Sequence, residues 1–360
     1  MEHSAKTILV TGGSGFLGAH VVDALIAEGG FHVIAISRNP PTYHNPKAQY
    51  IACDITNFSE IAAIVEQIKP IAIVHTITPG PFASPLLHDQ DYAATKNLVE
   101  LASECAFVKT FVYSGSAESF SNVSGAYAQP LTEKKAIWHT SKTAPSAYAK
   151  AKSASEAVVL WANGPSLATA VLCLPAMYGP RENEKTGIAI SFIRVANTFA
   201  TRIQLGSNNV VHEWIYVENA AIAHLLAVKA LFDPQQRAGG EAYFVTDGAP
   251  IKLWDFVRRL WTAAGDGECN SIGKIIIPWW VMLVLAVTTE VAFRVFTLGR
   301  ILPPLSRQHI HYMKEGAWFD TEKARERLGY EPLVSTDEGI RRTVDWYTRR
   351  SSAASVQKIQ

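Results

Sequence analysis

The stretch TGGSGFLG, residues 11–18, decides the fold of this 360-residue chain. It follows a short apolar run, 7–10, that is typical of a β-strand, and it leads into a segment with helical spacing. In that segment Leu17, Val21 and Leu25 share one face of the expected helix. A glycine-rich turn between a strand and a helix is typical of a dinucleotide-binding loop, because the free N–H groups of the helix face the phosphates. The sequence predicts such a loop, and a plain glycine turn is the alternative.

Each residue of this loop has an expected task. Gly12 permits the tight turn, Gly15 lets the backbone approach the pyrophosphate, and Gly18 lets the helix pack closely on the sheet. Phe16 and Leu17 lie in the first turn of the helix, where backbone N–H groups are free. These five are the predicted cofactor-binding residues of the loop.

Strands and helices alternate through the first half of the chain. Short β-branched apolar runs are separated by longer helical patterns. Strand–helix–strand order implies parallel pairing with right-handed crossovers. We therefore expect an α/β fold, a Rossmann-type doubly wound parallel sheet with a smaller C-terminal substrate lobe. The expected strands are 7–11, 32–37, 48–53, 72–76, 110–114 and 168–174, with a late strand at 240–246 that returns to the sheet.

The domain boundaries follow from this order. The nucleotide-binding domain is expected to take residues 1–177 and about 209–247. The smaller lobe is expected to take 178–208 and 248–348, and a small, polar tail at 349–360 is expected to be flexible.

One segment of the smaller lobe is unusually apolar. Residues 275–289 carry no charge, and the sequence predicts an apolar helix over 275–298. Fifteen helical residues span about 22 Å, short of the roughly 30 Å core of a bilayer. The helix is therefore expected either to be buried in the lobe or to form a monotopic patch that dips Trp279 and Trp280 into a membrane interface.

Composition excludes several classes of protein. With 33 basic and 32 acidic residues the formal charge is +1, so no nucleic-acid partner is expected. The four cysteines are scattered along the chain, without a CxxC pair or a histidine cluster: Cys53, Cys105, Cys173 and Cys269. Neither a metal site nor a disulfide framework is therefore expected. Six residues precede the first apolar run, and glycines follow it at once. No secretory signal is expected, and the predicted location is cytoplasmic.

The preference between two nicotinamide cofactors depends on the end of the second expected strand. NAD-binding loops place a carboxylate there, about 20 residues on, for the ribose 2′-hydroxyl. This chain has Ser37 and Arg38 instead. Because a guanidinium can pair with a 2′-phosphate, NADP is favoured and NAD is the alternative. Asp54, followed by Ile55, is expected to reach the adenine, although an aspartate at this place is equally typical of a turn.

A tyrosine with a lysine four residues on can carry a proton beside a nicotinamide. The chain has three such pairs, so the spacing alone does not identify the functional one. The pair that begins at Tyr43 flanks an Asn-Pro dipeptide, which a regular helix does not accommodate. The pair that begins at Tyr92 has no serine behind it at a strand end. Tyr148 and Lys152 follow a strand that ends near Ser116, so these three are the predicted catalytic residues.

Three motifs occur in the order typical of one enzyme superfamily. TGGSGFLG, SGSA at 114–117 and YAKAK at 148–152 resemble an extended short-chain dehydrogenase/reductase over nearly the whole chain. Within that superfamily the chain is similar to the 3β-hydroxysteroid dehydrogenase family, in particular its decarboxylating sterol-4α-carboxylate 3-dehydrogenase branch. The motifs behind this resemblance are HTITP (75–79), YGPRE (178–182), IYVENAAIAH (215–224), YFVTDGAPIKLWDF (243–256), the Pro-Trp-Trp segment and FDTEKARERLGYEP (319–332).

The resemblance implies NAD(P)-dependent oxidation of a 3β-hydroxyl on a steroid or polycyclic terpenoid to the 3-ketone. Where the substrate bears a 4-carboxylate, the product is a β-keto acid that loses CO2 without a further catalytic residue. Tyr148, acidified by the ammonium of Lys152 and by the nicotinamide cation, would accept the hydroxyl proton while Ser116 holds the oxygen. Thr76 and Pro175 would line the nicotinamide. The resemblance also implies an apolar substrate, contact with the cytosolic face of the endoplasmic reticulum membrane through 275–298, and a homodimer.

Other functions remain open at this point. One is a dehydrogenase/isomerase or a ketoreductase of specialised terpenoid biosynthesis that releases no CO2. The other is a nucleotide-sensing scaffold, which retention of the three catalytic residues disfavours. The chain also departs from the family pattern. Asp91 and Ala94 replace the usual Asn and Gly, Leu174 replaces an Arg, and Gly115 is expected to loosen the serine turn.

Overall fold

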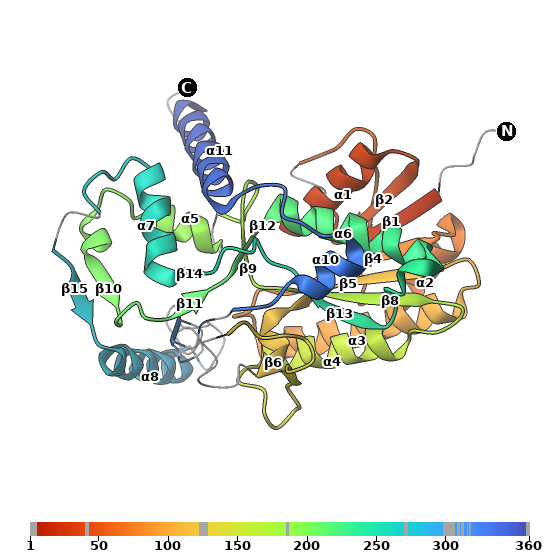
Figure 1. Ribbon diagram of the computed structural model, residues 1–360, viewed down its shortest axis with the longest axis horizontal. Helices are drawn as coiled ribbons and strands as arrows, with labels where there is room; N and C mark the ends of the chain where they lie inside the picture. Colours follow the sequence, from red (N-terminus) through yellow and green to blue (C-terminus); the bar gives the residue numbers. More distant parts are fainter. Residues whose placement is uncertain are drawn as a thin grey trace.

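The computed structural model describes residues 6–39, 43–121, 129–184, 187–269, 273–297 and 318–357, together with 307, 310, 313, 314 and 316. Its centre is a seven-stranded sheet with the order β13-β8-β5-β4-β1-β2-β3 (Figure 1). Every neighbouring pair is parallel, which confirms the doubly wound fold and the seven expected strands. The strands are β1 (Lys6–Thr11), β2 (Phe31–Ser37), β3 (Gln49–Ala52), β4 (Ala72–His75), β5 (Thr110–Ser116), β8 (Ala168–Leu174) and β13 (Glu241–Phe244).

Helices cover both faces of this sheet, so its strands are apolar on both sides. Alternate residues of β1 contribute to different cores: Ile8 and Val10 pack on one face and Leu9 on the other. The first face is covered by α1 (Phe16–Glu28), α6 (Val217–Phe232) and α10 (Glu322–Leu328). The second is covered by α2 (Phe58–Ile68), α3 (Pro85–Glu104) and α4 (Ala147–Trp161).

The remaining elements lie beyond the carboxyl ends of the strands, on the left in Figure 1. Their core is aromatic: Trp214 stacks on Phe256 with ring centroids 3.9 Å apart. The assignment of 178–208 and 248–348 to a substrate lobe stays a prediction. The paired strands there are β9 (Ala176–Tyr178) with β12 (Trp214–Tyr216), β10 (Ile203–Leu205) with β15 (Ile275–Ile277), and β11 (Val211–His212) with β14 (Ile251–Lys252). The helices are α5 (Ile188–Ile193), η3 (Phe199–Arg202), α7 (Leu253–Ala263) and α8 (Trp279–Phe296). Nearer the sheet lie η1 (Ala117–Ser119), η4 (Pro234–Gln236) and the pair β6 (Phe120–Ser121) with β7 (Ile137–Trp138).

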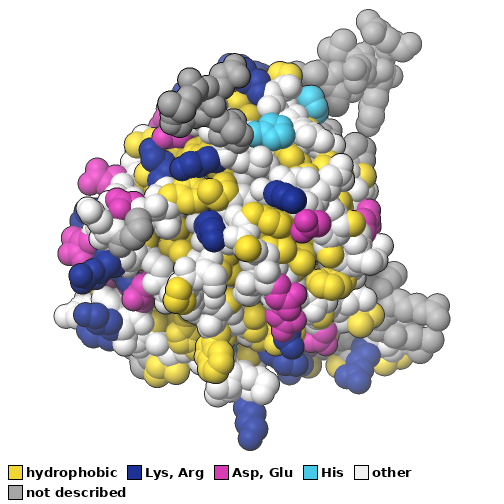
Figure 2. All heavy atoms as spheres, turned by 90° about the vertical axis from the view of Figure 1, so that its right-hand side faces the viewer, with side chains coloured by type: hydrophobic (Ala, Val, Ile, Leu, Met, Phe, Trp, Pro, Cys, Tyr) yellow, Lys and Arg dark blue, Asp and Glu magenta, His cyan; other side chains and the backbone are white. Residues whose placement is uncertain are grey.

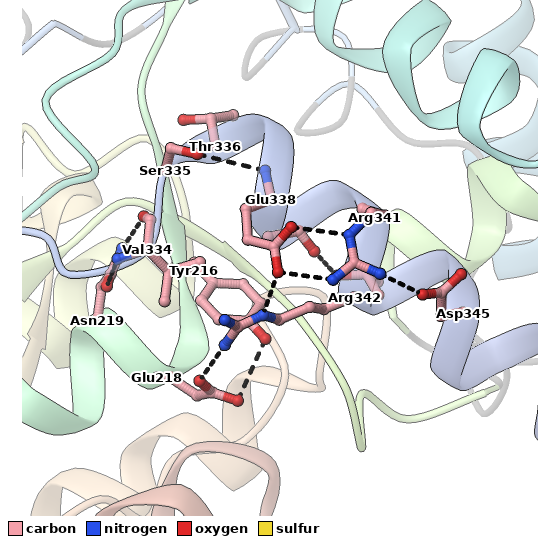
Figure 3. Close-up of polar contacts among 12 residues, drawn as sticks. Tyr216, Glu218, Asn219, Val334, Ser335, Thr336, Glu338, Arg341, Arg342 and Asp345 are labelled. Atoms are coloured by element: carbon pink, nitrogen blue, oxygen red, sulfur yellow. Dashed lines mark hydrogen bonds and ion pairs between the residues drawn. The ribbon is translucent and has the colours of Figure 1, made fainter.

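The last helix, α11 (Thr336–Gln357), is anchored to α6 at its start (Figure 3). The buried side chain of Asn219 donates to the carbonyl of Val334 at 2.8 Å and accepts from its N–H at 3.0 Å. Arg342 donates to Glu338 on the same helix at 2.7 Å and to Glu218 on α6 at 3.1 Å. Exposed ion pairs contribute little stability each, so the buried amide of Asn219 is the main polar anchor.

The flexible tail expected at 349–360 stays a prediction. Helix α11 continues through Gln357, and 358–360 lie outside the described residues. After Gly339 the sequence contains no glycine or proline, so nothing in it ends the helix early.

The apolar segment also differs from its expectation. Residues Ile275–Ile277 form strand β15, and the helix α8 begins only after Pro278. The β-branched isoleucines favour a strand, and proline fits before the first helical turn. Leu298, the last residue of the expected helix, lies outside the described residues. In α8 only Met282 and Ala286 are buried, so the interpretation as a buried core helix is wrong.

Candidate active site

The glycine-rich turn joins β1 to α1, as the sequence predicts. Gly12 has φ +78°, a backbone conformation that favours glycine. A Cβ atom on Gly18 would lie 2.1 Å from the carbonyl oxygen of Gly12, so the turn and the helix meet at a distance that only glycine allows. Gly15 precedes α1 and has no side chain to cap it, which leaves the N–H groups of Phe16 and Leu17 open to an anion. The residues therefore fit the pyrophosphate of a dinucleotide.

The residues predicted to hold the adenosine end lie next to this turn. The hydroxyl of Ser37 accepts from the N–H of Ser14 at 3.0 Å, so it stabilises the loop itself. Arg38 is exposed at the end of β2. Asp54 accepts from the N–H of Thr56 at 3.0 Å and from its hydroxyl at 2.8 Å. The first of these bonds lowers the pKa of Asp54, and the charge of Arg38 adds to the effect. Asp54 is thus a turn residue close to Arg38.

Thr76 and Pro175 follow β4 and β8, at the carboxyl edge of the sheet. The hydroxyl of Thr76 donates to the carbonyl of Thr11 at 2.7 Å and lies directly behind Gly12. Ile55 is buried in the core on one face of the sheet. Strands β1 and β4 are neighbours although β2 and β3 separate them in sequence, so this edge is a switch point of the sheet. Ligands bind at such points in open α/β sheets.

The three predicted catalytic residues meet at the same edge. Ser116 is the last residue of β5, and the hydroxyl of Ser146 caps α4 by accepting from an N–H at 3.0 Å. This cap places Tyr148 in the first turn of α4 and Lys152 one turn further on. The side chain of Tyr148 is half-buried, and its phenol lies close enough to Ser116 for the serine hydroxyl to favour the phenolate by a hydrogen bond.

Lys152 makes two hydrogen bonds to strand β5. Its Nζ donates to the hydroxyl of Tyr113 at 3.0 Å and to the carbonyl of Ser114 at 2.9 Å. Burial lowers the pKa of Lys152. Burial and the carboxyl of Glu118 raise the pKa of Tyr148 above its ordinary value. The acidification of this phenol by Lys152 together with the nicotinamide cation stays a prediction.

Three carboxyl groups surround this phenol and ammonium, and none of them is among the site residues predicted from the sequence. Burial raises the pKa of Asp91 to about 6 and that of Glu118 to about 7, and it also raises the pKa of Glu156. Asp91 was visible only as a departure from a family pattern. Glu156 could have been found by its spacing, because it lies four residues after Lys152 and eight after Tyr148. No sequence signal pointed to Glu118.

This arrangement can exchange a proton with a substrate hydroxyl beside a dinucleotide loop, which is the chemistry of alcohol oxidation. A model of the 3-beta hydroxysteroid dehydrogenase/isomerase family matches residues 9–273 of the chain. The chain belongs to this family. Membership of the 3-beta hydroxysteroid dehydrogenase/isomerase family makes it an NAD(P)-dependent oxidoreductase, as the sequence predicted.

Curated relatives in this dehydrogenase family cover most of the chain. A decarboxylating sterol-4-alpha-carboxylate 3-dehydrogenase of Gibberella zeae is 35% identical over 80% of this chain and 94% of that protein. The enzyme of the same name from Schizosaccharomyces pombe is 29% identical over 95% and 97%. Both matches agree with the branch that the motifs indicated.

Solved structures agree on the fold. A UDP-glucose 4-epimerase of Thermotoga maritima aligns with a TM-score of 0.73 and 22% identity over 96% of this chain and 99% of that chain. A Thermus thermophilus UDP-glucose 4-epimerase, solved in complex with NAD, aligns with a TM-score of 0.69 and 20% identity over 95% and 99%. At these identities the likeness shows that this chain shares the fold of the two epimerases, and it shows nothing about their activity in this chain.

Proposed function

We propose that the chain oxidises the 3β-hydroxyl of a sterol or polycyclic terpenoid that bears a 4α-carboxylate, with loss of that carboxylate as CO2. The observation that carries the proposal is the meeting of Ser116, Tyr148 and Lys152 beside the glycine-rich turn. The relatives in Gibberella zeae and Schizosaccharomyces pombe, whose names give this reaction, support the choice of substrate.

The proposed chemistry begins with the substrate hydroxyl beside Tyr148. The phenolate form of Tyr148 takes the proton of this hydroxyl and becomes the phenol, while Ser116 holds the substrate oxygen by a hydrogen bond. Lys152 supplies positive charge one helical turn away and keeps the end of β5 in place through the carbonyl of Ser114. A nicotinamide dinucleotide, held by the N-terminus of α1, would accept the hydride. The product is a β-keto acid, and its ketone is the electron sink for loss of CO2, so the protein needs no further acid or base.

The experiment is incubation of the purified protein with pairs of 3β-hydroxysterols that differ only in the 4α-carboxylate, with either cofactor. We expect reduced cofactor and CO2 in equal amounts from the carboxylated member of each pair. Formation of 3-ketone without CO2 from carboxylated substrates would replace the proposal by the dehydrogenase or ketoreductase alternative. An absence of turnover with every sterol and terpenoid tested would reject the substrate class.

For the cofactor, we propose a preference for NADP through Arg38, whose side chain is exposed beside the loop. Replacing Arg38 with alanine should weaken NADP binding by about 10-fold and leave NAD binding unchanged, because only the 2′-phosphate contacts the guanidinium. Titration of both reduced cofactors by fluorescence measures this. Lys47→Ala, which removes an exposed cation from the same connection between β2 and β3, is the control. An unchanged preference in Arg38→Ala would exclude the NADP assignment.

We also propose that α8 rests on a membrane, which the predicted cytosolic face of the endoplasmic reticulum would provide. The helix is apolar enough to enter lipid, with a mean hydropathy of 1.6. Only 11% of it is buried in the protein, so most of its apolar surface is exposed. The hydroxyl of Thr288 bonds back to carbonyls of Val284 and Leu285 at 3.0 and 2.9 Å, which satisfies it without water. At the other end of the molecule, basic and acidic side chains are scattered among apolar ones (Figure 2).

A stripe along α8 supports this proposal. Five exposed apolar side chains recur along the helix at intervals of three or four residues, which places them on one face. They are Trp280, Val284, Val287, Val291 and Val295. Such a stripe would be costly in water and suits the interface between headgroups and acyl chains. An apolar sterol would reach the site from the same lipid.

Glutamates on this stripe should release the protein from lipid. We expect the triple variant Trp280→Glu, Val284→Glu, Val291→Glu to bind phosphatidylcholine–phosphatidylethanolamine vesicles at least about 10-fold more weakly than the wild type, because each change removes an apolar side chain from the lipid. Co-sedimentation measures this. Trp161→Glu, on α4, where the side chain is 91% exposed, is the control and should bind like the wild type. Equal binding of all three proteins would place the membrane contact elsewhere or exclude it.

A further inference from the structure

The face of α4 that carries Tyr148 and Lys152 also carries a third polar side chain, that of Glu156. The spacing of four residues puts the three side chains in line, one helical turn apart. Glu156 is fully buried, so protein groups rather than water must satisfy its carboxyl. Its partners lie outside α4: two are in residues 115–119, here named the Ser116 turn, and one is Cys173 on β8.

The carboxyl of Glu156 binds both ends of the Ser116 turn. Its Oε1 accepts from the backbone N–H of Ser116 at 2.7 Å and from the hydroxyl of Ser119 at 2.6 Å. Its Oε2 faces the thiol of Cys173 at 3.9 Å. Two short bonds to one buried oxygen fix the turn against the helix that carries Tyr148.

Gly115 provides the space for this carboxyl. A Cβ atom on Gly115 would lie 2.7 Å from Oε1 of Glu156 and 3.0 Å from its Cδ. The same Cβ would lie 2.7 Å from Val171 on β8, so it could not be accommodated by a small shift to that side. The sequence interpretation, in which Gly115 loosens the serine turn, is therefore corrected: the glycine lets the carboxyl hold the turn.

We propose that Glu156 is a positioning residue, whose carboxyl holds the Ser116 turn so that the hydroxyl of Ser116 meets the phenol of Tyr148, and that Gly115 is needed to admit it. The proposal rests on the function proposed above. Glu156 and Tyr148 lie on one helix, about 12 Å apart along its axis, so the turn and the phenol move as one unit. The N–H of Glu118 donates to the hydroxyl oxygen of Ser116 at 3.1 Å and completes the orientation.

Glu156→Ala tests the proposal. The variant should lower kcat for sterol oxidation by about 10- to 100-fold, because a misplaced Ser116 no longer holds the substrate oxygen, while cofactor Kd and substrate KM change by less than about threefold. Glu156→Gln should recover most of the lost kcat, since its amide oxygen can accept both bonds. Val159→Ala removes a buried side chain from the same helix, away from the turn. It should lower Tm and leave kcat unchanged.

Gly115→Ala provides an independent variant if Glu156→Ala does not fold. Alone it should lower kcat to a similar extent, because the added methyl displaces the carboxyl. Combined with Glu156→Ala it should cause a much smaller further loss than it causes alone, because only the contact with Val171 then remains. Independent, additive losses in this double-mutant cycle would overturn the proposed steric relation.

A wild-type protein without sterol turnover would reject the proposed function, and the positioning proposal would then be decided by crystal structures of the wild type and Glu156→Ala. A Ser116 hydroxyl displaced from the Tyr148 phenol in the variant supports it. An unmoved Ser116 overturns it. With active wild-type protein, wild-type kcat in Glu156→Ala likewise overturns it, and so does a loss that Glu156→Gln does not recover.

Discussion

Replacing Tyr148 with phenylalanine is expected to lower kcat by at least about 10³-fold, because positioned acid–base catalysis contributes about 10²- to 10⁴-fold and no other phenol is bonded to Ser116 among the described residues. Cofactor Kd should stay within about twofold, since the change removes one oxygen and leaves the ring in contact with the imidazole of His88, 5.6 Å away between centroids. Steady-state turnover and fluorescence titration measure the two quantities.

The chain provides a matched control in its other helical tyrosine–lysine pair. Tyr92 lies on α3 at the same spacing from Lys96, without a strand-end serine beside it. Tyr92→Phe should retain wild-type kcat. If Tyr92→Phe lost activity and Tyr148→Phe kept it, the assignment of the proton carrier would be wrong.

The pH profile gives a second readout on the same residue. Burial and the carboxyl of Glu118 raise the pKa of Tyr148, so the protein's own groups favour the protonated phenol at neutral pH. The deprotonated form that accepts a proton from the substrate grows as pH increases. Oxidation should therefore accelerate from pH 7 to pH 9, reduction of the 3-ketone should slow over the same range, and the residual activity of Tyr148→Phe should not follow either trend.

The parts of the site that the sequence predicted are those with a local cause. A glycine-rich turn between a strand and a helix forms its own anion site, and a tyrosine four residues before a lysine lies on the same helical face whatever surrounds it. Placing Ser116 beside Tyr148 needed only the order of strand and helix in a parallel sheet. These inferences required no knowledge of packing, and the structure brings the residues together.

The parts that the sequence missed depend on which elements pack together. Lys152 donates to Tyr113 and Ser114, and Glu156 binds Ser116, because α4 lies against β5; these partners are about 40 residues away in the chain. Desolvation is also a property of the whole fold, and its effect in raising the pKa of Tyr148 could not be seen in the sequence. The exposure of α8 also depends on which elements pack together. The sequence shows that this segment is apolar, but only the fold shows that its surface is exposed.

Replacing Gly18 with alanine is expected to weaken binding of either nicotinamide cofactor by at least about 100-fold, which corresponds to about 2.7 kcal/mol. The added Cβ would lie 2.1 Å from the carbonyl oxygen of Gly12, 2.6 Å from its carbonyl carbon and 2.8 Å from the hydroxyl of Thr76. Two of these atoms belong to the backbone of the turn, so the turn itself must move. That movement takes the N–H groups of Phe16 and Leu17 out of line with the pyrophosphate.

The matched control is Gly164→Ala. Gly164 lies between α4 and β8, and an added Cβ there meets no atom within 4 Å. Both variants add one methyl group and remove one glycine, so they differ only in what the methyl contacts. Gly164→Ala should bind cofactor like the wild type. At a cofactor concentration that saturates the wild type, Gly18→Ala should show a much smaller rise in Tm, because the stabilisation depends on the ratio of ligand concentration to Kd. If Gly18→Ala bound cofactor with wild-type affinity, the close approach of turn and helix would not determine where the phosphates bind. The cofactor site would then have to be assigned to another part of the strand edge.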